Sequence, residues 1–261
     1  MKVTALFEYP VKALAGISLE TAAVNKRGLG MDRRYMLVDA KNQFLTQREL
    51  PELTQFNVEI DRHLSFRVKN KNDKIKLDAK TVGERVEVRV WDDAVMAREV
   101  NTQFSEWFSE QLNQEVRLVF MEDDDRRPTD PAYSEIGDQV GFADGFPILI
   151  ASESSLAELN NRLTNPVAMD RFRANIVVDG NMPFAEDIWQ TITIGDVVLR
   201  AAKPCARCQV ITIDQSTGQK ESEPLTTLSQ FRKTGNKVLF GLNVIPEKLG
   251  IIKVGQLVKA I

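Results

Sequence analysis

Apolar and polar residues alternate in short runs along the first 120 residues, with polar or glycine-containing turns between the runs. Alternation with a period of two is typical of β-strands that have one buried face. The expected strands are 2–7, 17–20, 35–38, 43–46, 58–60, 64–68, 75–77, 86–91 and 116–120. This part of the chain is therefore predicted to be mostly antiparallel β.

Helical spacing of apolar residues appears in three places. Asn101 can cap one helix and Ser152 a second one. A shorter helix is expected over 225–233, ended by Gly235. The apolar stripes of the first two helices are Phe104, Trp107, Phe108 and Leu112, and Leu156, Leu159 and Leu163. We interpret the aromatic residues of the first stripe as core residues rather than as a ligand-binding group.

The second half repeats the strand pattern at wider spacing. Strands are expected at 148–151, 176–178, 238–244, three times within 191–214, and in a hairpin over 251–261 about Gly255. Many short strands with few helices predict a mostly β (α+β) fold, with two antiparallel β-barrel-like domains and peripheral helices. The polar, proline-bearing stretch 122–131 reads as an exposed connection, so we expect domains at 1–121 and 122–261.

Composition narrows the class of protein. The 261 residues are 43% hydrophobic and 27% charged, which is ordinary for a globular protein, and the net charge of -3 gives no reason to expect nucleic acid or membrane binding. No apolar run approaches the roughly 20 residues that span a bilayer, and the start of the chain does not resemble a signal peptide. With only two cysteines, a cytoplasmic location is expected.

Both cysteines lie in the segment Lys203-Pro204-Cys205-Ala206-Arg207-Cys208, between expected strands. Neighbouring cations favour the reactive thiolate form of a cysteine. Two buried hydrophobic cysteines are one alternative. A redox pair would normally open a helix, and a structural zinc site needs four ligands where the chain adds only His63. Two possibilities remain. One cysteine is a reactive thiolate, or one cysteine binds a metal whose other ligands belong to a cofactor. The spacing of the two cysteines does not choose between them.

Several polar residues are weaker candidates. Arg173 and Asn175 would share a face of an extended segment, where a guanidinium beside an amide suits a phosphate or a polar heterocycle. A surface arginine beside a turn asparagine is the alternative. Lys12 and Arg34 are similar cationic candidates, and Asp144 lies in a glycine-rich turn whose N–H groups it could bind. A single histidine does not support a Ser-His-Asp triad, and no phosphate-binding loop or metalloprotease motif is present.

Taken together, the segments resemble the two-part MOSC proteins, a family that includes the mitochondrial amidoxime-reducing component and the bacterial reductase of N-hydroxylated bases. The resemblance runs in order through nearly the whole chain. Its pieces are Tyr9-Pro10-Val11-Lys12, Asp32-Arg33-Arg34-Tyr35, Phe142-Ala143-Asp144-Gly145, Phe172-Arg173-Ala174-Asn175-Ile176-Val177, Cys205-Ala206-Arg207-Cys208, Asp214-Gln215-Ser216-Thr217-Gly218 and Ile252-Lys253-Val254-Gly255.

The resemblance implies a β-rich N-terminal domain followed by a MOSC domain that binds molybdenum cofactor, with Cys208 as the protein thiolate on molybdenum. It implies that the pterin and its phosphate are held by Lys12, Arg34, Arg173 and Asn175, with Arg207 nearby. Asp144 would orient cofactor or substrate. Ala13 and Ala206 stand where eukaryotic relatives often have serines, so two hydroxyl contacts are absent or moved.

The implied activity is reduction of N-hydroxylated compounds such as amidoximes, hydroxylamines and N-hydroxylated bases. Bacterial relatives often add a ferredoxin domain, but an iron–sulfur cluster needs about four thiolates and this chain has two cysteines. We therefore expect no such cluster here, and electrons from a separate ferredoxin- or flavodoxin-type donor. A carrier of molybdenum cofactor or sulfur without turnover is the main alternative, and a structural β protein without cofactor is a third.

Overall fold

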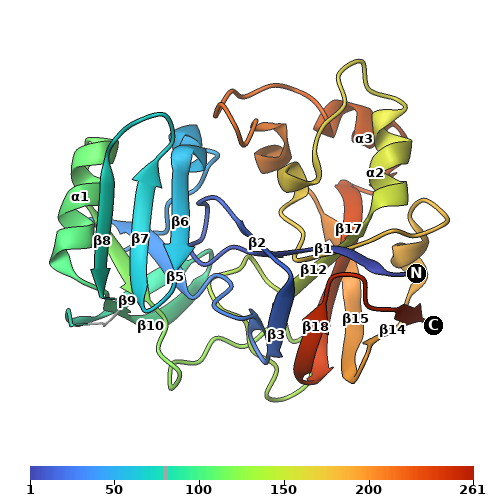
Figure 1. Ribbon diagram of the computed structural model, residues 1–261, viewed down its shortest axis with the longest axis horizontal. Coiled ribbons are helices and arrows are strands. Elements are labelled where there is room, and N and C mark those ends of the chain that lie inside the picture. The colour runs from blue at the N-terminus through green and yellow to red at the C-terminus, as the bar shows by residue number, and fades with distance from the viewer. Residues whose placement is uncertain (79–81) are drawn as a thin grey trace.

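The computed structural model describes residues 1–78 and 82–261. Its strands form two parts that lie side by side (Figure 1). The larger part is built on a nine-stranded sheet whose path is β19 (Val258–Ala260), β14 (Thr191–Ile194), β15 (Val197–Ala206), β17 (Lys237–Lys248), β12 (Ile148–Ser152), β13 (Ile176–Val178), β1 (Val3–Glu8) and β2 (Ile17–Leu19), with β16 (Lys233–Thr234) paired to β17. Neighbours are antiparallel except β12 and β13, which run parallel.

A second, three-stranded sheet covers one face of the large sheet. Its order is β18 (Gly250–Lys253), β3 (Thr21–Asn25) and β4 (Gly28–Leu29). Val24 and Ile252 from this sheet are fully or almost fully buried in one apolar cluster with residues such as Ile150 and Ile194 of the large sheet. The removal of these β-branched side chains from water holds the two sheets together.

The other face of the large sheet is covered by helices. These are α2 (Glu153–Asn160) and α3 (Leu225–Phe231) with the short 3-10 turns η2 (Met169–Phe172), η3 (Ala185–Ile188) and η4 (Gln209–Thr212). The Ser152 hydroxyl accepts a hydrogen bond from Ser155 N and so caps α2 as expected. Phe172 and Phe240 stack with ring centroids 3.9 Å apart in the apolar cluster beneath these helices.

The smaller part consists of two sheets and one helix around an aromatic core. Its elements are the sheet β5 (Tyr35–Asp39), β11 (Val116–Phe120), β10 (Asp93–Glu99) and β9 (Arg85–Val90), the sheet β6 (Phe56–Ile60), β7 (His63–Val68) and β8 (Lys74–Asp78), the turn η1 (Pro51–Gln55) and helix α1 (Thr102–Leu112). Asn101 caps α1 through a hydrogen bond from Gln103 N, and Phe104 and Phe108 pack against Phe66. The stripe predicted as core is core.

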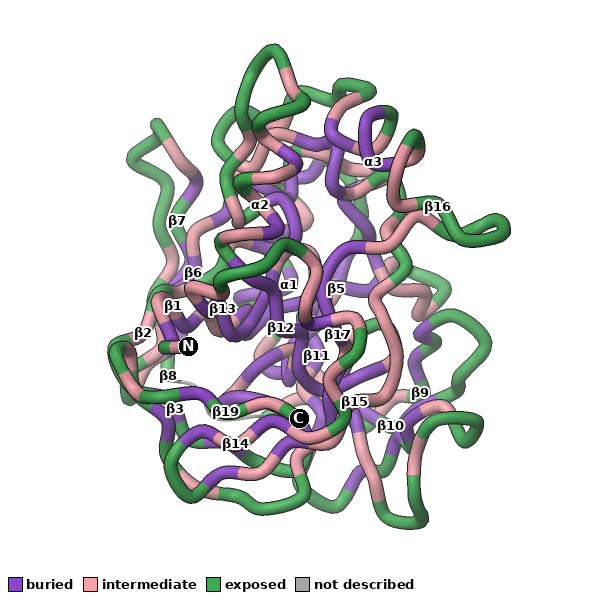
Figure 2. Tube along the Cα trace, turned by 90° about the vertical axis from the view of Figure 1, so that its right-hand side faces the viewer, coloured by how far each residue is buried: buried purple, intermediate pink, exposed green. Residues whose placement is uncertain are grey.

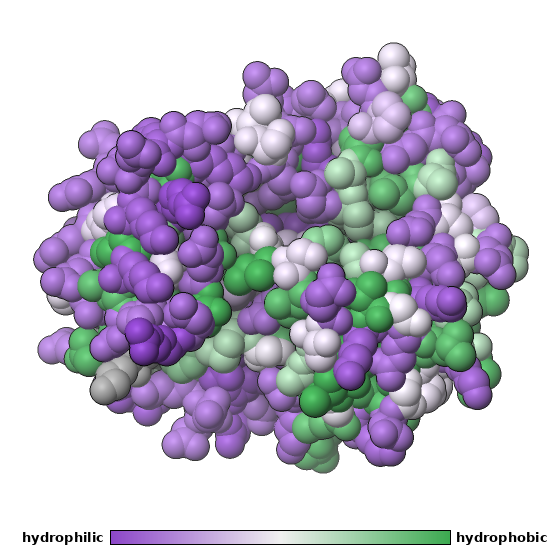
Figure 3. Space-filling view, in the orientation of Figure 1, coloured by the Kyte–Doolittle hydropathy of each residue, from purple (hydrophilic) through white to green (hydrophobic). Residues whose placement is uncertain are grey.

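These observations confirm the predicted mostly β fold with few helices. Buried residues concentrate in the central strands, including β12, β17, β5 and β11, and the peripheral loops are exposed (Figure 2). Within residues 1–78 and 82–261, no helix has the length and apolar character that crossing a membrane requires. Hydrophobic residues gather at the lower right of the face in Figure 3, near β18, where Leu249 and Ile251 are exposed.

Two strand predictions in the second half were wrong. The third strand expected before Asp214 is the 3-10 turn η4, in which Ile211 is fully buried among the residues under α3. Packing of that one side chain overrides the β-propensity of its neighbours. The expected hairpin about Gly255 does not form, because β18 pairs with β3 while β19 pairs with β14.

The first strands of the chain belong to the larger part. β1 pairs with β13, and β3 pairs with β18. The boundary between 121 and 122 stays a prediction, but β1 and β3, which precede it, are hydrogen-bonded to strands far later in the sequence. The connection after residue 121 is also less exposed than expected, because Asp125 and Arg127 are buried and Arg27 donates hydrogen bonds to three of its carbonyl groups.

Candidate functional site

A cavity of about 680 Å³ is lined by residues from both parts of the molecule. Its walls come from the loop after β1, the turns before β5 and between β9 and β10, the loop after β5, the connection before β12, the segment between η2 and β13, and the end of β15. Four acidic residues line it against seven basic ones, which are Lys12, Arg33, Arg48, Arg127, Arg173, Lys203 and Arg207. This excess of cations suits a ligand that carries negative charge.

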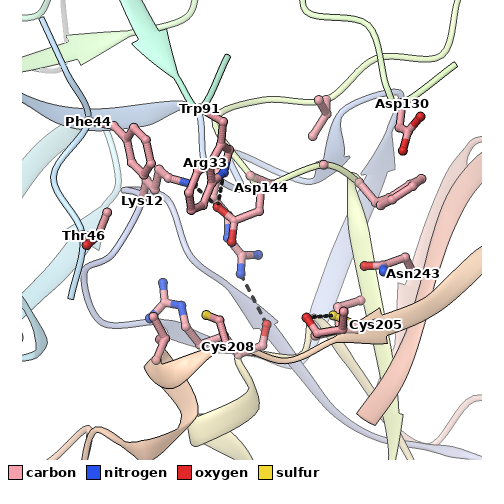
Figure 4. A pocket seen from close by; sticks show the side chains of 18 of the residues that line it. Lys12, Arg33, Phe44, Thr46, Trp91, Asp130, Asp144, Cys205, Cys208 and Asn243 are labelled. Carbon is pink, nitrogen blue, oxygen red and sulfur yellow. Dashed lines mark hydrogen bonds and ion pairs between the residues drawn. The ribbon is translucent and has the colours of Figure 1, made fainter. Parts of the chain in front are cut away.

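The cysteine segment forms one side of the cavity (Figure 4). Cys208 is exposed and immediately precedes η4, so its thiol is open to a ligand. Cys205 is half-buried, and its sulfur accepts a hydrogen bond of 3.0 Å from Arg207 Nη1. Lys203 instead pairs with Asp130 at 3.2 Å. Lys203 and Arg207 therefore do not both contact the same thiol. Of the two cysteine sulfurs, that of Cys208 is the accessible one.

Lys12 and Asp144 form an ion pair on the opposite side, beside Trp91 (Figure 4). Lys12 Nζ also donates to the Phe142 carbonyl at 2.8 Å, and Trp91 Nε1 donates to Asp144 Oδ1 at 3.2 Å. Desolvation alone would raise the pKa of the Asp144 carboxyl, but the Lys12 ammonium and the indole N–H hold that pKa below its usual range. Burial lowers the pKa of Lys12, an effect that Asp144 opposes.

The turn that carries Asp144 is held in place by Arg127. This guanidinium is 2% exposed and donates hydrogen bonds to the carbonyl groups of Gly141 and Asp144, at 2.8 and 3.3 Å. It also pairs with Asp93 at 2.8 Å. Asp144 is therefore fixed by the packing of its own turn and does not need to cap that turn itself, which leaves its carboxylate to face the cavity.

Arg33 lines the cavity, whereas Arg34, the residue chosen from the sequence, does not. Arg33 has a left-handed backbone with φ of 46°, which turns the chain just before β5. The Arg33 side chain points inward and pairs with Asp32, whereas Arg34 donates to the Met121 carbonyl and to Asp123.

Arg173 and Asn175 both line the cavity, although the segment is not extended as expected. Arg173 ends η2 with φ of 53°, and its guanidinium lies 4.2 Å from the centre of the Tyr9 ring. Burial and the nearby Arg33 charge lower the pKa of Arg173 to about 10, so it stays cationic near neutral pH. Its Nη1 donates to the Leu14 carbonyl at 2.8 Å.

The amide of Asn175 is fully used inside the protein. Its oxygen accepts hydrogen bonds from Leu149 N at 3.1 Å and from Arg33 Nη1 at 3.3 Å. Its nitrogen donates to the Phe7 carbonyl at 3.2 Å and to Asp32 Oδ1 at 2.9 Å. An asparagine amide offers two donors and one oxygen acceptor with two lone pairs. Asn175 therefore positions Asp32 and Arg33, and Arg33 is the cation that meets the cavity.

Four residues that line the cavity each have a buried side-chain atom without a hydrogen-bond partner. Across residues 1–78 and 82–261, the buried side-chain atoms without a hydrogen bond include Arg173 Nη2, Arg207 Nε, Thr46 Oγ1 and Thr129 Oγ1, and all four residues line the cavity. Leaving a buried donor unpaired costs about 1–3 kcal/mol. Because these atoms have almost no exposed surface, an acceptor-rich group such as a phosphate or a pterin would pair with the two guanidinium donors after a small movement of their side chains.

The residues of the cavity fit a metal whose ligands come mostly from a cofactor rather than from the protein. Among the described residues, no group of three or more His, Cys, Asp or Glu side chains could hold a metal ion. A metal near Cys208 would have that thiolate as a protein ligand and would take its other ligands from a cofactor. An anionic dithiolene cofactor with a phosphate therefore fits the donors present, with an accessible thiol on one side and cations around it.

Two family descriptions match the chain in succession. Residues 1–115 match the MOSC N-terminal beta barrel domain, and residues 137–259 match the MOSC domain. The two matches together cover nearly the whole sequence and include Cys208.

Named relatives fall into two groups. The mitochondrial amidoxime-reducing component 1 of Homo sapiens is 32% identical over 273 residues, covering 97% of this chain and 81% of the relative. The mitochondrial amidoxime reducing component 2 of Bos taurus is 30% identical, with the same coverage. The molybdenum cofactor sulfurase of Oryza sativa subsp. japonica is 31% identical over 90% of this chain. The chain spans 31% of the sulfurase's length, against 81% of the two amidoxime-reducing components.

Proposed function

This chain belongs to the MOSC proteins that join a MOSC N-terminal beta barrel domain to a MOSC domain, and on that basis we propose that it is a molybdenum-cofactor-dependent reductase of N-hydroxylated compounds. Its relatives are named as amidoxime-reducing components and as molybdenum cofactor sulfurases, and together with the MOSC domain these names support a function related to molybdenum cofactor. That the chain reduces N-hydroxylated compounds is the more specific part of our proposal.

One observation carries the proposal. The exposed Cys208 lines the same cavity as Arg173 and Arg207, and each of these arginines has one guanidinium nitrogen without a partner. A thiolate binds molybdenum, and guanidinium groups bind phosphate through charge-assisted hydrogen bonds. Their combination in one cavity supports a cofactor that carries both a metal and a phosphate.

In this proposal the chain's own residues bind and orient. Cys208 provides the protein ligand to the metal, and Arg173, Arg207 and Arg33 hold the pterin and its phosphate, with Asn175 fixing Arg33. When bound, the cofactor supplies the two-electron redox chemistry. Lys12 keeps Asp144 ionised, so the Asp144 carboxylate accepts a hydrogen bond from substrate rather than giving up a proton.

The overall reaction needs a source of electrons. Reduction of an N-hydroxylated compound consumes two electrons and two protons, breaks the N–O bond, and yields the amine or amidine and water. We propose that a separate ferredoxin- or flavodoxin-type protein delivers the electrons. The described residues offer two thiols, Cys205 and Cys208, whereas an iron–sulfur cluster takes about four.

The second candidate is a carrier of molybdenum cofactor or sulfur without turnover. Its support is the similarity to the plant molybdenum cofactor sulfurase, whose matching segment includes 90% of this chain. A carrier would need the same thiol and the same cations, so the cavity alone does not separate the two functions.

The test is turnover with a chemical reductant, which removes the need for the unknown electron donor. Protein loaded with molybdenum cofactor is mixed with reductant and an amidoxime or a hydroxylamine, and the amidine or amine is quantified by chromatography. We expect many product molecules per molybdenum, and none with cofactor-free protein. Loaded protein that forms no product from either substrate would contradict the reductase and favour the carrier.

A further inference from the structure

Two aromatic residues, Phe44 and Trp91, form a wall of the cavity on the side opposite Cys208 (Figure 4). We call this pair the aromatic wall. Their ring centroids are 5.0 Å apart at an interplanar angle of 60°. Trp91 is 44% exposed, although a large apolar side chain gains by burial. An indole held open to a cavity is available to stack against a ligand.

The backbone at Trp91 has the left-handed conformation that its two-residue turn requires, although tryptophan adopts it at a cost. Trp91 and Asp92 form the two-residue turn between β9 and β10, closed by the pair Val90 and Asp93. Trp91 has φ of 58°, a left-handed conformation that glycine or asparagine adopts readily in such turns and that costs other residues roughly 1–2 kcal/mol. The turn therefore carries a tryptophan where glycine or asparagine would be less strained, which agrees with a role for the indole in binding.

The wall is fixed in orientation by its neighbours. Trp91 Nε1 donates a hydrogen bond to Asp144 Oδ1, and the Arg48 guanidinium lies 4.5 Å from the Trp91 ring centre. Lys12 Nζ lies 5.0 Å from the centre of the Phe44 ring. Arg48 covers one face of the indole, so a ligand that stacks on Trp91 uses the other face. A ring anchored at its polar edge loses little freedom on such stacking, which favours binding.

The polar groups beside the wall define what the ligand must carry. Both hydrogen bonds that the Asp144 carboxylate accepts from described residues go to Oδ1. Its Oδ2 can therefore accept an N–H from a ligand, and the exposed Asp92 adds negative charge at the same place. A flat ring that bears an amidine-type N–H group would stack on the indole and donate to Asp144 at once.

We propose that the aromatic wall selects aromatic N-hydroxylated substrates, amidoximes on an aromatic ring or N-hydroxylated heterocyclic bases, by stacking on Trp91 while Asp144 accepts their N–H. The proposal rests on the reductase function and adds to it a specificity-determining residue, Trp91. It predicts discrimination between aromatic and aliphatic substrates that carry the same functional group.

Binding of two amidines to the cofactor-loaded protein tests this without turnover. Benzamidine and acetamidine carry the same charge and N–H groups, but only benzamidine has a ring. Dissociation constants are measured by calorimetry for the natural sequence, Trp91→Phe and Trp91→Asn. Asparagine accepts a positive φ, so the turn is kept while the ring is lost. Trp91→Asn should weaken benzamidine binding about tenfold, the usual scale for one stacked ring, and leave acetamidine within about twofold.

The other variants separate stacking from the hydrogen bond and from general damage. Trp91→Phe keeps a ring and should bind benzamidine within about threefold of the natural sequence. Met96→Ala, on β10 of the same hairpin, changes a residue that is 40% exposed and does not line the cavity, and should change neither constant. KM for benzamidoxime against acetamidoxime should follow the same pattern.

Unchanged benzamidine affinity in Trp91→Asn would overturn the proposal, and so would an equal loss of affinity for both amidines. A lower molybdenum content in this variant would also overturn it, because Trp91 would then contact the cofactor. Turnover of the two amidoximes tests the reductase function separately from binding. If the natural sequence reduces neither amidoxime while Trp91→Asn still distinguishes the two amidines, the wall binds aromatic ligands but the proposed reduction fails.

Discussion

At the residue scale, the cavity is formed by side chains that lie far apart in the sequence. Lys12, Asp144, Arg173, Asn175, Arg207 and Cys208 all line one cavity. Arg34 does not, because the left-handed backbone at Arg33 turns that neighbour inward instead. Thr46, Thr129 and Trp91 were missed, since nothing local marks a hydroxyl or an indole whose partner lies elsewhere in the sequence. Trp91 was expected inside the strand 86–91, whereas it lies in the turn between β9 and β10.

Asn175 shows how a residue chosen for binding can act through another residue. Replacing Asn175 with Ala leaves the Leu149 N–H, the Phe7 carbonyl and Asp32 without their buried partner. We expect the free energy of unfolding to fall by about 1–3 kcal/mol, as measured by denaturant titration. Exposed Asn236→Ala is the matched control and should change stability by less than about 0.5 kcal/mol. Equal stability of the two variants would show that the amide is not structural.

At the element scale, strands such as β6 and β7 were predicted well, because apolar and polar residues alternate along them and they pair with each other. Strands were predicted badly where their conformation depends on a partner far away in the sequence. The residues of η4 have strand propensity but turn into the core through Ile211. The last two strands looked like one hairpin, yet each adds to the edge of a different sheet. Pairing with residues far away in sequence is invisible to a pattern read over a short window.

Glu8 couples two elements that lead to the cavity. It ends β1, and its Oε1 accepts a hydrogen bond of 2.7 Å from Met31 N, in the turn that carries Arg33. Burial raises the pKa of Glu8 to about 7, with the Met31 N–H opposing the shift and the Asp32 charge adding to it. An unfolded glutamate titrates near 4.3. Between roughly pH 4.3 and 7 the folded state therefore holds the proton more tightly than the unfolded state.

This difference predicts a pH dependence of stability. The contribution of Glu8 is fully present below about pH 4.3 and is lost as the pH rises to about 7. Glu8→Gln cannot ionise, so its stability relative to the natural sequence should increase from pH 5 to pH 7.5. Denaturant titrations at both pH values measure this, with exposed Glu20→Gln as control. A relative stability of Glu8→Gln that stays constant, or falls, would contradict the raised pKa.

At the scale of the whole molecule, the mostly β fold follows from composition and pattern, but the interleaving of the chain does not. Residues 3–29 complete sheets formed by residues 148–260, so the first part of the sequence belongs in space with the last. This arrangement brings Lys12, after β1, within the same cavity as Cys208, after β15. The two-domain boundary, the cytoplasmic location and the electron donor stay predictions.

The central claim is that the thiol of Cys208 binds molybdenum in this cavity. X-ray absorption at the molybdenum edge of cofactor-loaded protein counts the sulfur neighbours of the metal directly. We predict one sulfur neighbour fewer in Cys208→Ser than in the natural sequence, and no change in Cys205→Ser, whose sulfur is half-buried beside Arg207. An unchanged number of sulfur neighbours in Cys208→Ser, at full molybdenum content, would contradict the account.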